Sequence, residues 1–367
     1  MKRIFITLAT AIALVGCNCK QECKTASQNE SESSVLAIKE QGFFTAGGTV
    51  LKTDGTFDPI KGQYNPAGQT LHADYANIFY QVPQPYNNHR VYFLHGFGQS
   101  RVGWMNTPDG REGFAPMFLR KGYATYLIDQ PRRGAAGQPS VEATVTTPTL
   151  DQAWFTQFRM GYYPKLFSNS KFPQGEETLH KFFQQMTPNI GEFDIPKVTE
   201  ALVATFEKGG EGIFITHSQG GIIGWNVAMQ TPKVTAVVAI EPGTFPFPEG
   251  EVPTITKENT SFPVGGFGVP KEQFLTLTKR PIVIYFGDNI PDFDKTAELP
   301  AQNFWSGVRE LAYKFAEVIN ANGGDCKVID LPKAGIIGNT HFMFQDLNNQ
   351  EVFEHIYKWL ESKKLAN

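Results

Sequence analysis

The chain has 367 residues, a formal net charge of −3 and 41% hydrophobic residues, a composition typical of a globular protein. It is long enough to bury a large core, in one big domain or in two small ones. No basic stripe occurs, so a nucleic-acid partner is not expected. The 30 phenylalanines fit an apolar binding site without establishing one.

The first 17 residues are predicted to be an export signal. Lys2 and Arg3 give a basic start, and the apolar run Ile4–Val15 is too short to cross a bilayer as a mature helix. The run stops directly at Gly16 and Cys17, which resembles a bacterial lipobox, in which Cys17 would be lipidated and become the new N-terminus. The alternative is an ordinary secretory signal cleaved a few residues away, which would leave the protein secreted without an anchor.

Residues 18–40 are predicted to be a polar tether, because the segment is polar and shows no apolar period. Cys19 and Cys23 could pair in an oxidising compartment, and no fourth ligand lies near them, so no metal site is expected. No later run is apolar for about 18 residues, so contact with a membrane is expected only through the N-terminal lipid. Cys326 is expected to be a buried strand thiol.

An alternation of strands and helices is predicted for residues 41–367. Two early antiparallel strands precede a series of buried strands that alternate with helical patterns; the buried strands are Arg90–Gly96, Tyr123–Gln130, Gly212–Ser218, Val234–Gly243, Arg280–Asp288 and Cys326–Pro332. Apolar strands separated by helices are typical of an α/β fold with a mostly parallel sheet covered on both faces. Two stretches break the pattern: an aromatic- and proline-rich cap or lid insertion at about 134–195, and a Pro/Gly-rich excursion at about 244–278.

Polar residues follow the predicted strands, at the edge of an open α/β sheet where ligands bind. They are His95, Asp129, Ser218, Glu241, Asp288 and, after the last strand, His341. This set contains a serine, several carboxylates and a histidine, which are the residue types of a nucleophile, an acid and a base. Asp129 is interpreted as structural.

Ser218 lies between a predicted strand and a predicted helix, in the sequence T-x-S-x-G. Small residues two positions before and after a serine allow a tight strand-to-helix turn that exposes the hydroxyl as a nucleophile. The usual pattern is G-x-S-x-G, whereas this chain has Thr216 in the first small position and Gly220 in the second. The alternative is a serine that only caps the following helix.

The segment "HGFGQS" (His95–Ser100) follows the first buried strand and is predicted to form an oxyanion hole. A tetrahedral oxyanion needs pre-aimed N–H donors, and here they would be the backbone N–H groups of Phe97 and Gln219. The helix N-terminus at Gln219 also favours an anion. The alternative is a simple turn that ends the strand.

His341 is the predicted base, because among the seven histidines only this one follows the last strand on a glycine-rich loop. The acid must orient the imidazole and stabilise its charged form. Glu241, Asp288 and, more weakly, Asp292 all fit this role by position, and the residues alone leave the choice open.

The order HG-x-G, T-x-S-x-G, carboxylate and late histidine resembles the α/β-hydrolase superfamily over about residues 42–365. The segments "TPDGREGFAPMFLRKGYATYLIDQPRRG", "HSQGG", "IEPG" and "GNTHFMFQDLNN" resemble a small branch of bacterial esterases, in which the acid is a glutamate after the sixth strand. That resemblance implies a triad of Ser218, Glu241 and His341, with oxyanion donors at Phe97 and Gln219. The branch has adjacent cysteines after HG, whereas this chain has Phe97 and Gly98, which keeps a backbone donor but alters the surroundings of the hole. The segment "DGR" (residues 109–111) is also typical of the branch, and its role does not follow from the sequence.

The sequence therefore predicts an exported, lipid-anchored serine esterase of the bacterial cell envelope. It would act on a small-molecule ester through an acyl-enzyme on Ser218 and would need no metal or organic cofactor. Two alternatives remain: an amidase, peptidase or lactone hydrolase with the same triad, or a non-catalytic lipoprotein that binds a ligand in a retired hydrolase pocket. The sequence gives no indication of the oligomeric state.

Overall fold

The computed structural model describes residues 35–145 and 149–366. The predicted signal, Cys17 and the predicted tether up to residue 34 lie outside the described residues. None of the helices within the described ranges is long and apolar enough to cross a membrane.

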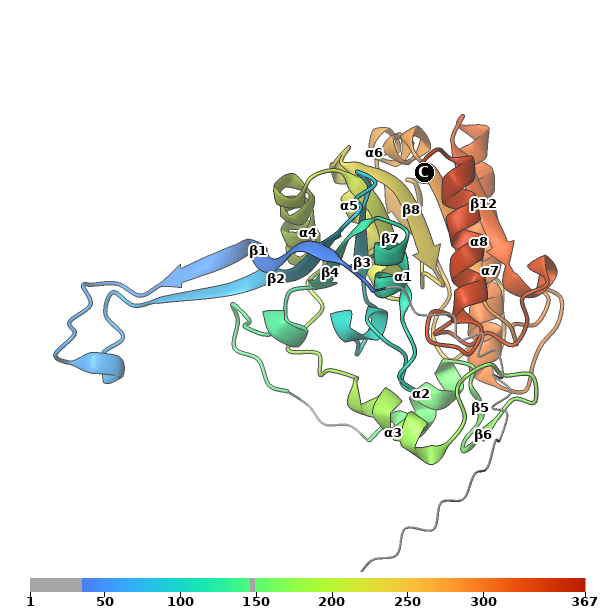
Figure 1. Ribbon diagram of the computed structural model, residues 1–367, viewed down its shortest axis with the longest axis horizontal. Coiled ribbons are helices and arrows are strands. Elements are labelled where there is room, and N and C mark those ends of the chain that lie inside the picture. Colours follow the sequence, from blue (N-terminus) through green and yellow to red (C-terminus); the bar gives the residue numbers. More distant parts are fainter. Residues whose placement is uncertain (1–34, 146–148, 367) are drawn as a thin grey trace, which may run out of the picture. The chain divides into compact units, whose positions relative to one another are not determined.

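The core is an eight-stranded mixed sheet with the strand order β1-β2-β4-β3-β7-β8-β11-β12 (Figure 1). β1 pairs with β2 and β2 with β4 in antiparallel fashion, and every later pair is parallel. The predicted α/β fold is confirmed. The sheet strands are β1 (Ile38–Lys52), β2 (Thr70–Pro83), β3 (Arg90–Leu94), β4 (Ala124–Asp129), β7 (Gly212–His217), β8 (Val234–Ile240), β11 (Pro281–Phe286) and β12 (Asp325–Asp330).

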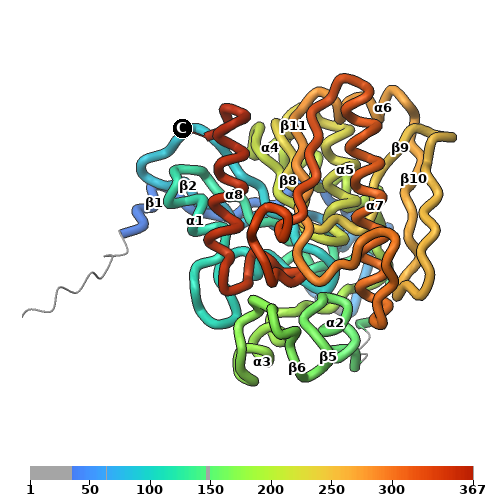
Figure 2. The backbone as a smooth tube through the Cα atoms, turned by 90° about the vertical axis from the view of Figure 1, so that its right-hand side faces the viewer, coloured from blue at the N-terminus to red at the C-terminus, as the bar shows by residue number. Residues whose placement is uncertain are grey.

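Helices cover both faces of the sheet (Figure 2). The α-helices are α1 (Phe114–Arg120), α2 (Asp151–Gln157), α3 (Glu176–Gln184), α4 (Ile195–Gly209), α5 (Gly220–Gln230), α6 (Lys271–Leu275), α7 (Pro300–Ala321) and α8 (Asn349–Ser362). Helices α4, α5 and α7 pack on one face, and α1 and α8 pack on the other. Short 3-10 helices occupy Gly62–Tyr64, Arg101–Trp104, Gly134–Ala136, Thr276–Lys279 and Leu331–Ala334.

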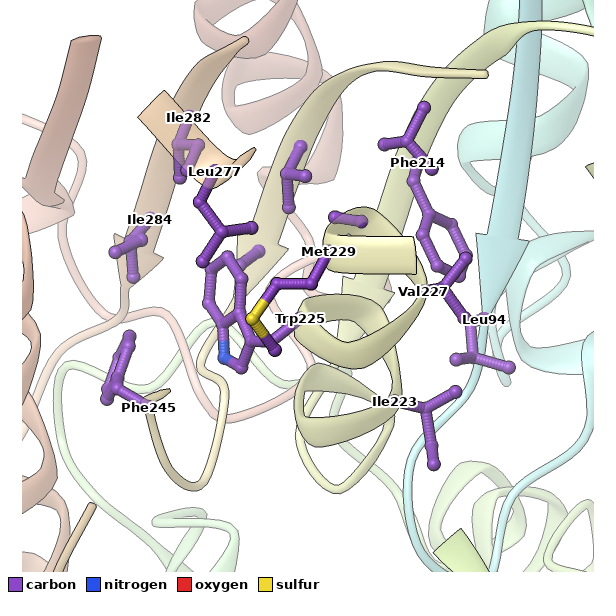
Figure 3. Packing of buried hydrophobic residues seen from close by; sticks show 14 of the residues in the cluster. Leu94, Phe214, Ile223, Trp225, Val227, Met229, Phe245, Leu277, Ile282 and Ile284 are labelled. Carbon is purple, nitrogen blue, oxygen red and sulfur yellow. The ribbon is translucent and has the colours of Figure 1, made fainter. Parts of the chain in front are cut away.

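Each parallel strand contributes to both halves of the core, because successive side chains of a strand point to opposite faces. In β7, Phe214 belongs to the cluster beneath α5, whereas Ile213 and Ile215 belong to the cluster beneath α1 and α8. Figure 3 shows the first cluster, with Trp225 and Met229 of α5 packed against the sheet. This burial on both faces explains why the parallel strands are apolar throughout.

β1 and β2 form a long hairpin whose outer part is largely exposed (Figure 1). The first of the two predicted early strands, β1, begins at Ile38, within the segment 18–40 that was predicted to be a polar tether. The glycines at 42, 47 and 48 interrupt the alternation of polar and apolar residues, so sequence periodicity does not show the whole strand.

The segment 134–195 contains α2, α3 and a two-stranded sheet of β5 (Gly161–Tyr162) and β6 (Lys165–Leu166). Figure 1 shows these elements beyond the C-terminal ends of the parallel strands, and Figure 2 shows them gathered on the same side of the fold. The segment 244–278 contains α6 and the short parallel strands β9 (Pro246–Pro248) and β10 (Phe267–Val269). The first of these segments lies over the sheet edge that carries the predicted site.

Candidate active site

Ser218 occupies a tight turn between β7 and α5, with a left-handed backbone φ of 54°. Its backbone N–H donates to the carbonyl of Ile240 at 3.0 Å. A Cβ atom at Gly96 would lie 2.7 Å from the Ser218 Cβ, and one at Gly220 would lie 2.5 Å from the His95 carbonyl oxygen. Glycine is therefore needed at both positions for the turn to pack, and the strained serine is a common sign of a functional site.

Thr216 replaces the glycine of the usual pattern, and Gly224 provides the space that this larger residue needs. A Cβ atom at Gly224 would lie 2.7 Å from Thr216 Cγ2. Strand β7 and helix α5 thus still approach closely, with the small residue on the helix instead of the strand. This pairing explains how the T-x-S-x-G variant can form the same turn.

The residues of the predicted oxyanion donors, Phe97 and Gln219, line the same cavity as Ser218. Gln219 is the N-cap residue of α5, and Phe97 follows β3 in a turn that contains Gly98 at φ 63°. Within residues 35–145 and 149–366, the backbone N–H groups of Phe97 and Gln219 donate to no protein acceptor. Both are therefore available to an oxyanion bound beside Ser218.

His341 is fully buried and binds Glu241, with His341 Nδ1 and Glu241 Oε2 2.5 Å apart. Because a carboxylate only accepts, Nδ1 carries the proton and Nε2 keeps its lone pair. His341 Nε2 has no hydrogen-bond partner in the described part of the chain. Burial, opposed by Glu241, lowers the pKa of His341, so the imidazole is a neutral base at neutral pH.

Aromatic rings and backbone contacts fix the His341 imidazole. Phe158 stacks on it with ring centroids 5.5 Å apart and planes 13° apart, and Trp305 lies on it at 4.4 Å. The backbone N–H of His341 donates to the Phe158 carbonyl at 3.0 Å, and His217 Nε2 donates to the His341 carbonyl at 2.9 Å. The ring therefore has little freedom to rotate.

Glu241 follows β8 with a left-handed φ of 42° and a fully buried carboxylate. Besides His341, its oxygens accept from Arg159 Nη1 at 2.8 Å, from Arg159 Nη2, and from the backbone N–H of Gly287 at 2.7 Å. Burial opposes ionisation, but the charge of Arg159 and the hydrogen bond from His341 outweigh it and lower the pKa of Glu241 to about 2. The carboxylate is therefore charged at any pH at which the imidazole can act as a base.

Asp288, the alternative acid, makes different contacts. Its Oδ2 accepts from Asn169 Nδ2 at 3.0 Å and from the Gly338 N–H at 2.8 Å, and its Oδ1 accepts from the Asn289 N–H at 2.6 Å. Asp292 is exposed. The structure thus brings Glu241 to His341, whereas Asp288 joins the loops around residues 169 and 338.

Comparison with known proteins shows the family of this chain. A sequence profile described as "Alpha/beta hydrolase family" matches residues 91–320. This protein belongs to the alpha/beta hydrolase family. It is 27% identical over 321 residues to the "Probable secreted lipase phiG" of Fungal sp. (strain ATCC 74256), covering 77% of this chain and 84% of the relative. It is also similar to a solved structure titled "The Atomic Resolution Structure of a Novel Bacterial Esterase", with a TM-score of 0.72 and 27% identity over 91% of this chain and 98% of that one.

A cavity of about 580 Å³ adjoins the turn of this hydrolase, and Ser218, Gln219 and His341 line it. Most of its wall is apolar, and no Asp, Glu, Lys or Arg of the described residues lines it. Seven aromatic side chains contribute to the wall: Phe97, Trp154, Phe158, Phe193, Phe262, Phe304 and Trp305. The cap segment 134–195 supplies three of these rings, so the cap shapes the space beside the serine.

Several functional contacts of the hydrolase were not expected from its sequence. Arg159 and Phe158 lie in the predicted cap, which the sequence showed only to be rich in aromatic residues and proline. Arg111 of the "DGR" segment binds Asp109 and donates to the backbone carbonyls of Gln345 and Asp346, so it anchors the chain just after His341. These partners are far apart in sequence, and no local pattern connects them.

Proposed function

We propose that this protein is a serine carboxylic ester hydrolase with Ser218 as nucleophile, His341 as base and Glu241 as acid. The observation that carries the proposal is the Glu241–His341 hydrogen bond, which leaves His341 Nε2 without a partner among the described residues, in the same cavity wall as Ser218. Left-handed backbone at both Ser218 and Glu241 also supports a functional site, because such strain costs about 1–3 kcal/mol per residue.

In the proposed reaction, His341 Nε2 takes the Ser218 proton while Ser218 Oγ attacks the ester carbonyl carbon. The carbonyl oxygen becomes an oxyanion that accepts from the N–H groups of Phe97 and Gln219. Glu241 stabilises the imidazolium, which then gives its proton to the leaving alkoxide. Water then attacks the carbonyl carbon of the acyl-enzyme while His341 Nε2 takes a proton from it. The bond from this carbon to Ser218 Oγ breaks as His341 returns the proton to Oγ, which regenerates Ser218 and releases the acid.

The lining of the cavity favours an uncharged, apolar ester. Burying a charged group against seven aromatic rings would be costly without a counter-ion, and the lining provides none. The relatives named as a lipase and an esterase support an ester over an amide. A panel of amides, lactones and esters with matched acyl groups distinguishes the alternatives, and ester turnover should be fastest.

The central test is Ser218→Ala, with turnover of a short-chain aryl ester as the measurement. Loss of the nucleophile should lower kcat by roughly 10⁶-fold. A fluorophosphonate should label the unmodified protein at Ser218 and should not label the variant. Full turnover by the variant would exclude Ser218 as the nucleophile, and no labelling of the unmodified protein would favour a ligand-binding lipoprotein.

We also propose that the protein is exported and anchored by a lipid on Cys17. The basic start and the short apolar run ending at Cys17 support this, as does similarity to a relative named as secreted. Expression in a bacterium with a radiolabelled fatty acid should label the unmodified protein, whereas Cys17→Ser should stay unlabelled. Labelling of neither protein would favour an ordinary cleaved signal.

A further inference from the structure

Arg159 lies just after the cap helix α2 and contacts the carboxylate of Glu241, which also binds His341. Its side chain is fully buried, and its Nη1 and Nη2 donate to the two separate oxygens of the Glu241 carboxylate. A planar guanidinium that spans both oxygens fixes the plane of a carboxylate, which a single contact cannot do. The oxygen that receives Nη1 also receives His341 Nδ1.

The backbone around Arg159 is itself held in an unusual conformation. Arg159 has a left-handed φ of 54°, and its Nε donates to the Asp288 carbonyl at 3.0 Å. The preceding residue, Phe158, stacks on His341 and accepts its backbone N–H. Two consecutive cap residues thus contact the proposed base and the proposed acid, and Arg159 adds a third strained residue to Ser218 and Glu241.

We infer that Arg159 is a positioning residue for the reaction, through which the cap orients the Glu241 carboxylate toward His341. This inference rests on the proposed triad. Without Arg159 the buried carboxylate would keep the Gly287 N–H and His341 as its partners among the described residues, so its plane relative to Nδ1 would be fixed less firmly. A buried acid that has lost its cation also binds a proton more readily.

The charge of Arg159 gives this role a pH signature. Arg159 disfavours the charged form of His341, whereas Glu241 favours it. Removing the cation should therefore raise the pKa of His341 and move the acidic limb of kcat/KM to higher pH. His217 and Asp346 also lie close to Glu241 and His341. Burial keeps His217 neutral, and Asp346 is unchanged in every Arg159 variant, so neither residue accounts for a difference between the variants. Asp288 turns its carboxylate to Asn169 and Gly338.

The test compares Arg159→Met and Arg159→Lys with the unmodified enzyme. The product of an aryl ester is quantified by chromatography between pH 4 and 10, and rates are given per active site from burst titration. Arg159→Met should lose about 10- to 100-fold in kcat, the size expected for one charge-assisted hydrogen bond, with little change in KM. Its acidic limb should rise by about one pH unit. Arg159→Lys keeps the positive charge but lacks the planar guanidinium that donates to both carboxylate oxygens. It should therefore lose kcat while the acidic limb of its kcat/KM profile stays at the same pH.

Arg132 provides a matched control. It is also a buried arginine with left-handed φ, 65°, and its Nε and Nη2 bind Asp74 at 2.8 and 3.1 Å. Arg132→Met should lower the unfolding temperature but leave the acidic limb in place. A wild-type kcat and acidic limb for Arg159→Met would overturn the inference.

If Arg159→Met does not fold, an unchanged kcat for Arg159→Lys would overturn the inference equally. Ser218→Ala in the same series separates the two proposals. If Ser218→Ala is inactive and the Arg159 variants are normal, only the role of Arg159 fails. If Ser218→Ala is active, the proposed function itself fails.

Discussion

Two parts of this hydrolase meet at the proposed triad, and they hold it in different ways. The ends of β7 and β8 carry Ser218 and Glu241 on left-handed backbone that continues directly from buried strands. The segment just after α2 contributes Phe158 and Arg159. Phe158 stacks on the His341 ring and accepts the His341 backbone N–H, and Arg159 donates to the Glu241 carboxylate. In the proposed mechanism the sheet places Ser218 and Glu241 and the cap orients Glu241 and His341, so changes in the two parts should have different effects.

The largest effect is expected at the strand ends. Glu241→Gln should lower kcat by about 10³- to 10⁴-fold, because an amide cannot stabilise the imidazolium and can favour the wrong tautomer of His341. Asp288→Asn should stay within about tenfold of the unmodified enzyme, since Asp288 contacts loops and not the imidazole. Steady-state kinetics on one ester measures both variants. The opposite ranking would move the acid to the end of β11.

A smaller effect on turnover is expected from the cap side. Phe158→Leu removes the ring stacked on His341 and should lower kcat by about two- to tenfold, the equivalent of one aromatic contact. Phe155→Leu is the matched control, because Phe155 is also buried, one turn earlier in α2, but packs against Tyr163. If both variants lose activity equally, general loosening of α2 and not the stack on His341 would explain the change.

The turn at Ser218 should respond mainly in stability. Gly224→Ala places a methyl group against Thr216 and should lower the free energy of unfolding by about 1–3 kcal/mol. Adding Thr216→Ala should restore much of this loss, because the clashing Cγ2 is removed. Denaturant unfolding of both single variants and the double variant measures the coupling. Additive effects would show that the two residues do not compensate for each other.

These residues also show how far the sequence could predict the molecule. The parallel strands, the α/β fold and the positions of Ser218, Glu241 and His341 follow local patterns: apolar runs, small residues and polar residues at strand ends. The contacts of Arg159 could not be predicted, because its partner Glu241 is 82 residues away and the pairing depends on how the cap lies on the sheet. The choice between Glu241 and Asp288 likewise depends on side-chain direction, which strand position does not determine.

The smallest effect on turnover, and a clear one on stability, is expected at Asp346. This buried carboxyl accepts from the Thr340 N–H, Thr340 Oγ1 and Asn339 Nδ2, and burial raises its pKa to about 7. The unfolded chain releases this proton near pH 4, whereas the folded protein keeps it until about pH 7. Between about pH 4 and 7, folding is therefore coupled to the uptake of one proton by Asp346. The contribution of Asp346 to stability is fully present below about pH 4 and is lost as the pH rises to about 7.

Asp346→Asn should remove that loss, so the unfolding temperature of the variant relative to the unmodified protein should rise between pH 4 and 7. Asp74→Asn is the informative control, because its pH dependence should appear below about pH 4 and have the opposite sign. Burial opposes ionisation of Asp74, but hydrogen bonds from Arg132 and Ser140 lower its pKa. Its contribution is therefore present above the unfolded pKa of about 3.9 and is lost as the pH falls through the lower folded value. Parallel curves for Asp346→Asn and the unmodified protein would show that Asp346 is ionised throughout, and the loop that carries His341 would then hold a buried charge.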